Sequence, residues 1–260
     1  RHTFDARVSR RDLAETYLPH FERAVRDGGV LSVMTAYNAV DGVPVSGSRA
    51  LLDDLLRARW GFDGYVVTDC GAINDMWKRH RYSADAAVAS AQAVRAGTDL
   101  ECGSDFRHLA AAVQRGLLTE ADIDRALTRL FTARMRLGLF DPPERVAYAR
   151  TPYALNDSTA HRALNRDVAR KSLVLLENDG VLPFAPTLTR LAVIGPTADD
   201  LDALIGNYNG TPSAPVTILA GLRQAAASRG MTVTSARGSD ITRGTSEARR
   251  KAVDVAGSSD

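Results

Sequence analysis

The sequence has 260 residues, of which 45% are hydrophobic and 25% are charged, and its formal net charge at pH 7 is +2. This balance is typical of a soluble globular protein of one or two domains with a sizeable core. It argues against a membrane-spanning protein, because no apolar run approaches the roughly 18 residues of a span, and against a nucleic-acid-binding one, because the basic residues are dispersed among acidic ones.

Helix and strand signals alternate from the start of the chain to Gly138. Ser9 and Asp12 form a capping box for a first helix, which Gly28 and Gly29 end. Further helical patterns and three short apolar strands follow, the helices at 48–59, 83–96, 105–116 and 119–135 and the strands at 29–38, 64–70 and 97–103. Each strand needs a crossover to reach the next, which favours a parallel sheet covered by helices.

The three predicted strands carry their polar residues at their C-terminal ends. In WGFDGYVVTDCGAINDMW, residues 60–77, a β-branched run ends in Thr68, Asp69 and Cys70. In parallel α/β folds this end of the strands carries the chemistry. Asp69 is therefore a candidate catalytic carboxylate, and the alternative is that it caps a following helix or satisfies a turn.

The pattern changes after Gly138. Pro142, Pro143 and Pro152 interrupt a segment without helical periodicity, which we interpret as an interdomain linker. Beyond it come helical patterns at 159–171, 218–229 and 246–255, strands at 191–196 and 231–238, and a loop at 205–217. These signals predict a second α/β domain that begins near Thr187 and stops in mid-unit.

The chain resembles glycoside hydrolase family 3, the exo-acting β-glucosidases and β-xylosidases. Collinear blocks carry the resemblance: FDARVSRRDLAETYLPHF, SVMTAYNAVDGVP, LLRARWGFDGYVVTDCGAI, AGTDLECG, RLFTARMRLGLFD, ARKSLVLLENDGVLP, LAVIGP and IGNYNGTPS. The resemblance implies an internal fragment of an α/β protein: the C-terminal part of a (β/α)₈ TIM-type barrel at 1–140, a linker at 141–186, and the truncated start of an α/β sandwich domain at 187–260.

The resemblance also assigns roles to four residues. Asp69 matches the catalytic nucleophile, which attacks the anomeric carbon in retaining glycosidases. Tyr37 matches a tyrosine that borders the sugar subsite, the alternative being a core aromatic residue. Arg1 aligns with an arginine that binds sugar hydroxyls, although a first residue also frays easily. Met34 matches a position beside the subsite, and packing explains it equally well.

Cys70 stands where many β-glucosidases have a tryptophan near the sugar, so the resemblance makes Cys70 a fourth substrate-binding candidate beside Tyr37, Arg1 and Met34. Thr68 stands where serine is commoner. Asp-Cys at this place is more similar to the β-xylosidase and arabinosidase branch and to the bacterial glucosidases close to it, so the resemblance leaves the choice among xylose, glucose and arabinose open. Cys70 and Cys102 end neighbouring predicted strands, where a disulfide can form, but two buried free thiols are the alternative that the sequence favours. Asp99 and Glu101 reach the same rim, as subsite carboxylates or as structural ones.

The resemblance predicts a retaining exo-β-glycosidase that hydrolyses terminal non-reducing β-D-xylosyl or β-D-glucosyl residues of oligosaccharides or of aryl and alkyl β-glycosides. The alternative is a non-catalytic carbohydrate-binding homologue or an inactive fragment. No metal or cofactor is expected. The acid/base glutamate is expected beyond residue 260, because Glu177 and Asp75 lie in no matching motif. Enzymes of this type are often exported, which suggests a periplasmic or secreted location, and the oligomeric state is not predicted.

Overall fold

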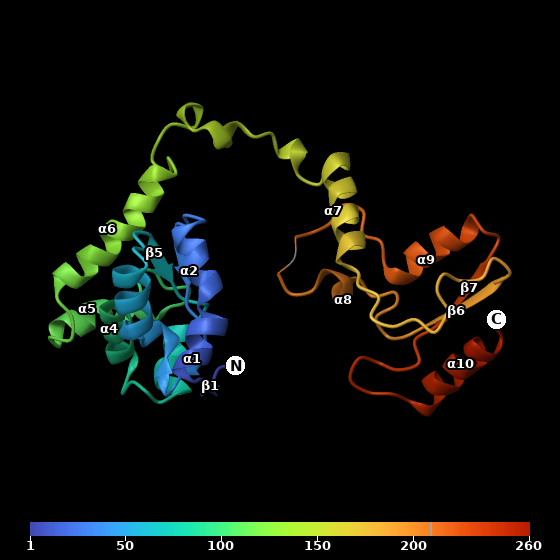
Figure 1. Ribbon diagram of the computed structural model, residues 1–260, viewed down its shortest axis with the longest axis horizontal. Helices are drawn as coiled ribbons and strands as arrows, with labels where there is room; N and C mark the ends of the chain where they lie inside the picture. The colour runs from blue at the N-terminus through green and yellow to red at the C-terminus, as the bar shows by residue number, and fades with distance from the viewer. Residues whose placement is uncertain (209) are drawn as a thin grey trace. The chain divides into compact units, whose positions relative to one another are not determined.

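A computed structural model describes every residue of the chain except Asn209. The chain forms two compact units, Arg1–Arg150 and Thr151–Asp260 (Figure 1). Both units combine helices with short strands, so the fold is mixed α/β as predicted. The finer division, with a linker at 141–186, stays a prediction.

The first unit contains five short strands, most of them parallel. They are β1 (Asp5–Ala6), β2 (Ser32–Met34), β3 (Ala39–Val40), β4 (Val43–Pro44) and β5 (Tyr65–Val67). β2 pairs in parallel with β5, with Val33 opposite Val66, and Val67 bridges in parallel to Leu100. The predicted parallel order of the three strand segments is therefore confirmed. β1 also pairs in parallel with β3, and β3 and β4 form an antiparallel hairpin.

Gly64 allows β2 and β5 to approach each other. The next residue, Tyr65, donates its backbone N–H to the carbonyl oxygen of Leu31 at 3.2 Å. A Cβ atom added to Gly64 would lie 2.1 Å from that same carbonyl oxygen. Because the obstacle is backbone, any larger residue would force the two strands apart at the point where their pairing begins.

Helices flank these strands; the segments 50–59, 86–96, 109–114 and 120–136 match predicted helices, whereas the helix Ala72–Lys78 was not predicted. They are α1 (Arg10–Asp12), α2 (Pro19–Arg26), α3 (Ala72–Lys78), α4 (Ala86–Ala96), α5 (Leu109–Gln114) and α6 (Glu120–Arg136), with π-helical segments at Leu13–Tyr17 and Ala50–Arg59. Side chains of Ser9, Asp85 and Thr119 cap α1, α4 and α6 by accepting backbone N–H groups. Gly138, in the left-handed conformation, lies just beyond the end of α6 as expected.

The prediction of one continuous opening helix is wrong. The helix begins at Arg10, passes through a π-helical segment and starts again at Pro19, which is the first residue of α2. Proline has no N–H to donate and its ring clashes with the preceding turn, so it starts a helix well but interrupts one. The N–H of Leu18 bonds instead to the carbonyl of Leu13 at 2.9 Å.

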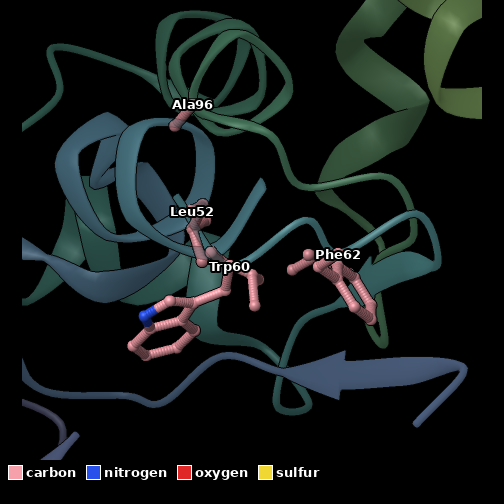
Figure 2. Close-up of a cluster of buried hydrophobic side chains, with 6 residues drawn as sticks. Leu52, Trp60, Phe62 and Ala96 are labelled. Carbon is pink, nitrogen blue, oxygen red and sulfur yellow. The ribbon is translucent and has the colours of Figure 1, made fainter. Parts of the chain in front are cut away.

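The largest buried cluster of the first unit lies beside β5 (Figure 2). Its members are buried hydrophobic side chains, contributed by the segment 50–67 and by α4: Leu52, Leu56, Trp60, Phe62, Val66 and Ala96. Full burial of side chains such as Leu or Phe contributes roughly 1.5–3 kcal/mol each. Alanines on α4 allow α3 and α5 to pack closely against it, in two further clusters that contain Met76 and Leu118. The strand that leads to Asp69 is therefore anchored in the core.

The second unit is built around two parallel strands, β6 (Arg190–Ile194) and β7 (Thr232–Ala236), with Ala192 opposite Thr234. Its helices are α7 (Thr159–Ser172), α8 (Leu201–Ile205), α9 (Ile218–Ala227) and α10 (Ser246–Gly257). α8 was not predicted, and the predicted loop at 205–217 includes Asn209, which lies outside the described residues. Short 3₁₀ turns occupy the proline-rich segment, at Pro143–Arg145, Ala147–Arg150 and Tyr153–Leu155.

None of the helices within the described part of the chain has both the length and the apolar character needed to cross a membrane.

Candidate active site

Asp69 lies two residues beyond the end of β5, and its backbone is fixed on both sides. Its N–H donates to the carbonyl of Thr35 at 3.2 Å, and its own carbonyl accepts the N–H of Ala72 at 3.0 Å. One carboxylate oxygen accepts the N–H of Cys70 at 2.7 Å. Among the described residues the other oxygen accepts no hydrogen bond, so half of this carboxylate is available to a ligand.

A layer of buried hydroxyl groups supports the strand ends below Asp69. Three buried threonines lie at the ends of the parallel segments: Thr35 directly after β2, Thr68 directly after β5, and Thr98 two residues before Leu100. Thr35 hydrogen-bonds to the hydroxyl of Ser46 at 2.7 Å, and Thr98 donates to the carbonyl of Ser46 at 3.0 Å. These threonines account for part of the polar pattern at the strand ends, because satisfied buried hydroxyls fix the strands relative to one another.

Tyr37 is bonded to the residue that follows Asp69. The Tyr37 hydroxyl donates to the backbone carbonyl of Cys70 at 2.9 Å. The guanidinium of Arg1 lies over the Tyr37 ring, 4.8 Å from its centroid. The structure thus brings together three of the predicted site residues, Arg1, Tyr37 and Cys70, beside Asp69.

Two histidines that the sequence did not single out surround Tyr37. The ring centroid of His2 is 4.4 Å from that of Tyr37, and Nδ1 of His2 lies 2.6 Å from Oδ2 of Asp75. Nε2 of His80 lies 2.8 Å from the backbone carbonyl oxygen of Tyr37. Asp75 is a residue of α3, and its side chain is only 8% exposed. No local spacing pattern links these residues, so sequence reasoning missed them.

Met34 is the last residue of β2, opposite Val67 in the parallel pair. It is 61% exposed in this chain. It therefore lies near the same strand ends as Asp69, and both interpretations of this residue stay predictions.

Cys70 and Cys102 form a disulfide bond, which corrects the preference for two free thiols. Cys102 makes two further links to this region. Its backbone carbonyl accepts the N–H of Gly71 at 2.6 Å, and its N–H donates to the Thr68 hydroxyl at 3.0 Å. Cys70 and Cys102 lie at the ends of neighbouring parallel segments. This spacing permits either a disulfide bond or two free thiols, so the sequence alone did not determine which of them forms.

Asp99, which the sequence left open as a subsite carboxylate, is engaged by other parts of the protein. Its side chain, 1% exposed, pairs with Arg57 and with Arg129, and one oxygen accepts the N–H of Val66 at 2.8 Å. Burial lowers the pKa of the Arg57 guanidinium, and the charge of Asp99 opposes that shift. Asp99 therefore stabilises β5.

Glu101 is also a structural carboxylate in this chain. Its two carboxylate oxygens accept the backbone N–H groups of Asp105, at 2.8 Å, and of Phe106. Those two residues open the 3₁₀ turn Asp105–His108 that precedes α5. Glu101 therefore holds the loop that carries Cys102 against the following helix.

Within the described residues, no group of three or more His, Cys, Asp or Glu side chains is arranged to hold a metal ion. The site consists of one partly available carboxylate, that of Asp69, and of Tyr37, which bonds to the next residue and is contacted by an arginine and two histidines. Such a set suits an uncharged, hydroxyl-rich ligand, because a guanidinium and neutral donors can bind hydroxyl pairs while the carboxylate remains free to react.

Curated relatives of the chain share much of its sequence. A xylan 1,4-beta-xylosidase of Xylanibacter ruminicola is 42% identical over 83% of this chain and 25% of its own length. A probable beta-D-xylosidase 7 of Arabidopsis thaliana is 41% identical over 86% of this chain and 30% of its own length. The chain thus spans about a quarter to a third of the length of the curated relatives it matches.

Solved structures match the fold as well. An exo-beta-xylosidase in complex with a xylobiose aziridine activity-based probe aligns with a TM-score of 0.87 and 35% identity, over 100% of this chain and 34% of that one. A β-glucosidase of Erythrobacter marinus aligns with a TM-score of 0.83 and 30% identity, over 98% of this chain and 37% of that one.

Two family models cover most of the sequence. The glycosyl hydrolase family 3 N-terminal domain matches residues 2–133, and the C-terminal domain of the same family matches residues 173–260. The first match alone includes Asp69, Tyr37, His2 and His80, and Arg1 lies one residue before it. The chain belongs to glycosyl hydrolase family 3.

Proposed function

We propose that this chain is part of a retaining exo-β-glycosidase that hydrolyses terminal non-reducing β-D-xylosyl or β-D-glucosyl residues. The observation that carries the proposal is Asp69, a carboxylate with one unengaged oxygen among the described residues, fixed beyond the end of β5 by bonds to Thr35 and Ala72. The names of the relatives, xylosidases and glucosidases, support the substrate class.

In this mechanism Asp69 is the nucleophile. Its free oxygen attacks the anomeric carbon, the bond from that carbon to the leaving oxygen breaks, and a covalent glycosyl-enzyme forms. Water then releases the sugar with the original β configuration. The hydrogen bond from the Cys70 N–H orients the carboxylate of Asp69.

The residues around Asp69 have binding roles in the same proposal. Arg1 and the Tyr37 hydroxyl would bind sugar hydroxyls, and Met34 and Cys70 would border the subsite. A second carboxyl group, about 5 to 5.5 Å from the first, must protonate the leaving oxygen and later activate water. We assign it to a glutamate encoded beyond residue 260, so the 260 residues alone are expected to be inactive.

The proposed architecture follows from the same assignment. The parallel segments of the first unit would form the last part of a (β/α)₈ barrel, and their C-terminal ends would carry the site, as in other barrels. The pair β6–β7 would belong to the start of an α/β sandwich domain. The parallel pairing of β2 with β5 and the bridge to Leu100 support the first part.

A 2-deoxy-2-fluoro-β-xyloside with a good leaving group tests the proposal in the full-length protein. The fluorine slows hydrolysis of the covalent intermediate, so the sugar should remain attached to the nucleophile. Peptide mapping by mass spectrometry should then find the label on Asp69. A label on another residue would refute the assignment of the nucleophile, and absence of both labelling and hydrolysis would favour a non-catalytic carbohydrate-binding homologue.

A further inference from the structure

The backbone around Asp69 is held from two opposite directions. From the β2 side, the carbonyl of Thr35 accepts the N–H of Asp69. From the other side come three links that all begin at Cys102: its disulfide to Cys70, its carbonyl to the N–H of Gly71, and its N–H to the Thr68 hydroxyl. One residue of a neighbouring segment is thus bound to the residue before Asp69 and to both residues after it.

These three links differ in strength and in how they can be broken. The two hydrogen bonds are made by the backbone of Cys102, so they tolerate replacement of its side chain. The disulfide is the one covalent link among them, and it depends on the redox state. Cys70 is exposed, so a dissolved reductant can reach the bond, whereas the Thr68 hydroxyl is buried at 1% exposure.

The loop that carries Cys102 is itself fixed. Glu101 accepts two backbone N–H groups from the turn that leads to α5. A Cβ atom added to Gly103 would lie 2.5 Å from a carboxylate oxygen of Glu101, so the loop follows that side chain closely. The loop around Cys102 is therefore fixed by Glu101, and a bond to Cys102 restrains the segment 68–71.

We propose that Cys102 is a positioning residue for Asp69, and that the Cys70–Cys102 disulfide holds the nucleophile in its reactive orientation. This inference rests on the proposed function. A dithiol such as dithiothreitol would cleave the S–S bond by exchange, which leaves two thiols on the protein and converts the dithiol into its cyclic disulfide. The segment 69–71 would then be restrained on the Cys102 side by hydrogen bonds alone.

Kinetics of the oxidised and the reduced full-length protein test the inference. With 4-nitrophenyl β-D-xyloside, we expect reduction to lower kcat about 10- to 100-fold, the range in which small misplacements of a reacting group act, with little change in KM. Reoxidation should restore kcat. Intact mass confirms the state of the bond, and a far-ultraviolet circular dichroism spectrum confirms that the reduced protein remains folded. An unchanged kcat after complete reduction would overturn the inference.

Hydrogen–deuterium exchange supplies a second readout that needs no activity. In the reduced protein the N–H of Gly71 should exchange about tenfold faster or more, because local opening sets this rate, while α4 exchanges as before. Equal exchange of Gly71 in both states would also overturn the inference. If the oxidised protein neither hydrolyses the substrate nor takes the fluoro-sugar label, the proposed function fails, and exchange alone decides whether Cys102 restrains this segment.

Cys102→Ser is the matched variant. It retains both backbone hydrogen bonds of residue 102 and loses only the disulfide, so its kcat should equal that of the reduced wild type and should not respond to dithiothreitol. Thr68→Val removes the hydroxyl that accepts the Cys102 N–H and keeps the size of the side chain. Thr68→Val should lower kcat more in the reduced protein than in the oxidised one, because after reduction hydrogen bonds alone restrain this segment on the Cys102 side.

Discussion

Nδ1 of His2 lies 2.6 Å from Oδ2 of Asp75, although 73 residues separate them in the sequence. The bond ties the start of the chain to α3. The His2 ring also contacts the ring of Tyr37, whose hydroxyl donates to the carbonyl of Cys70, next to Asp69. Asp75 is therefore connected to the proposed site through two intermediate side chains, those of His2 and Tyr37.

Asp75→Asn is expected to lower kcat/KM about tenfold in the full-length protein. The amide keeps the shape of the side chain but loses the charge, and a hydrogen bond to a charged group contributes about 1.5–3 kcal/mol. Steady-state kinetics with an aryl β-xyloside measure the effect. Asp63→Asn is the control, since Asp63 is 77% exposed and pairs with Arg136 on the surface. Equal activity of both variants would contradict the role of Asp75.

Asp69→Gly should lower kcat by about 10⁴-fold or more, because it removes the group that forms the covalent bond. Sodium azide should partly restore cleavage of an aryl β-xyloside, since a small anion can occupy the vacated space and attack the anomeric carbon. Nuclear magnetic resonance should identify the product as the α-glycosyl azide. A β-glycosyl azide, or full activity without azide, would show that Asp69 is not the nucleophile.

Asp99→Ala should destabilise the fold by about 3–5 kcal/mol, because it leaves the buried guanidinium of Arg57 without its charged partner. Urea unfolding measures the free energy. The double variant Asp99→Ala/Arg57→Met should recover part of the loss, since it buries no unpaired charge. If the effects of the two substitutions simply added, the pair would not be coupled as the structure shows.

Asp122 predicts a specific pH dependence of stability. Hydrogen bonds from the Thr119 N–H and hydroxyl, and one from Arg125, lower its pKa from 3.8 to about 2. A lowered pKa in the folded state stabilises the protein above the unfolded value, and this contribution is lost as the pH falls from about 4 through 2. Asp122→Asn should therefore be less stable than wild type at pH 5, and the difference should shrink towards pH 2. A difference that stays constant with pH would contradict the assignment.

The parts of the fold that follow local rules were predictable. Caps at Ser9 and Thr119, the parallel order of the strands and the position of Asp69 at a strand end all follow from neighbouring residues. α3 was missed because it begins after Gly71, which lies in the left-handed conformation and provides no side-chain cap. Pro19 is a local cause of the division of the opening helix. It was missed because the apolar periodicity continues across it and indicated one helix.

The features of the fold and the site that the sequence did not predict are long-range contacts. The bond between His2 and Asp75, and the pairing of Asp99 with Arg57 and Arg129, join residues whose separation in the sequence leaves no periodic signal. The spacing of parallel segments brings Cys70 near Cys102 but does not decide whether the two sulfur atoms bond. These pairings and the disulfide bond depend on the three-dimensional arrangement of the segments.

Gly64 sets a limit on how this protein can be redesigned at the point where β2 and β5 meet. Its missing side chain leaves room for the carbonyl of Leu31, and no rotamer change can supply that room, because the obstacle is main chain. A saturation library at this codon should therefore return glycine alone among active clones. Attempts to alter sugar preference by mutagenesis are better directed at the rim of the strands, where side chains can move aside.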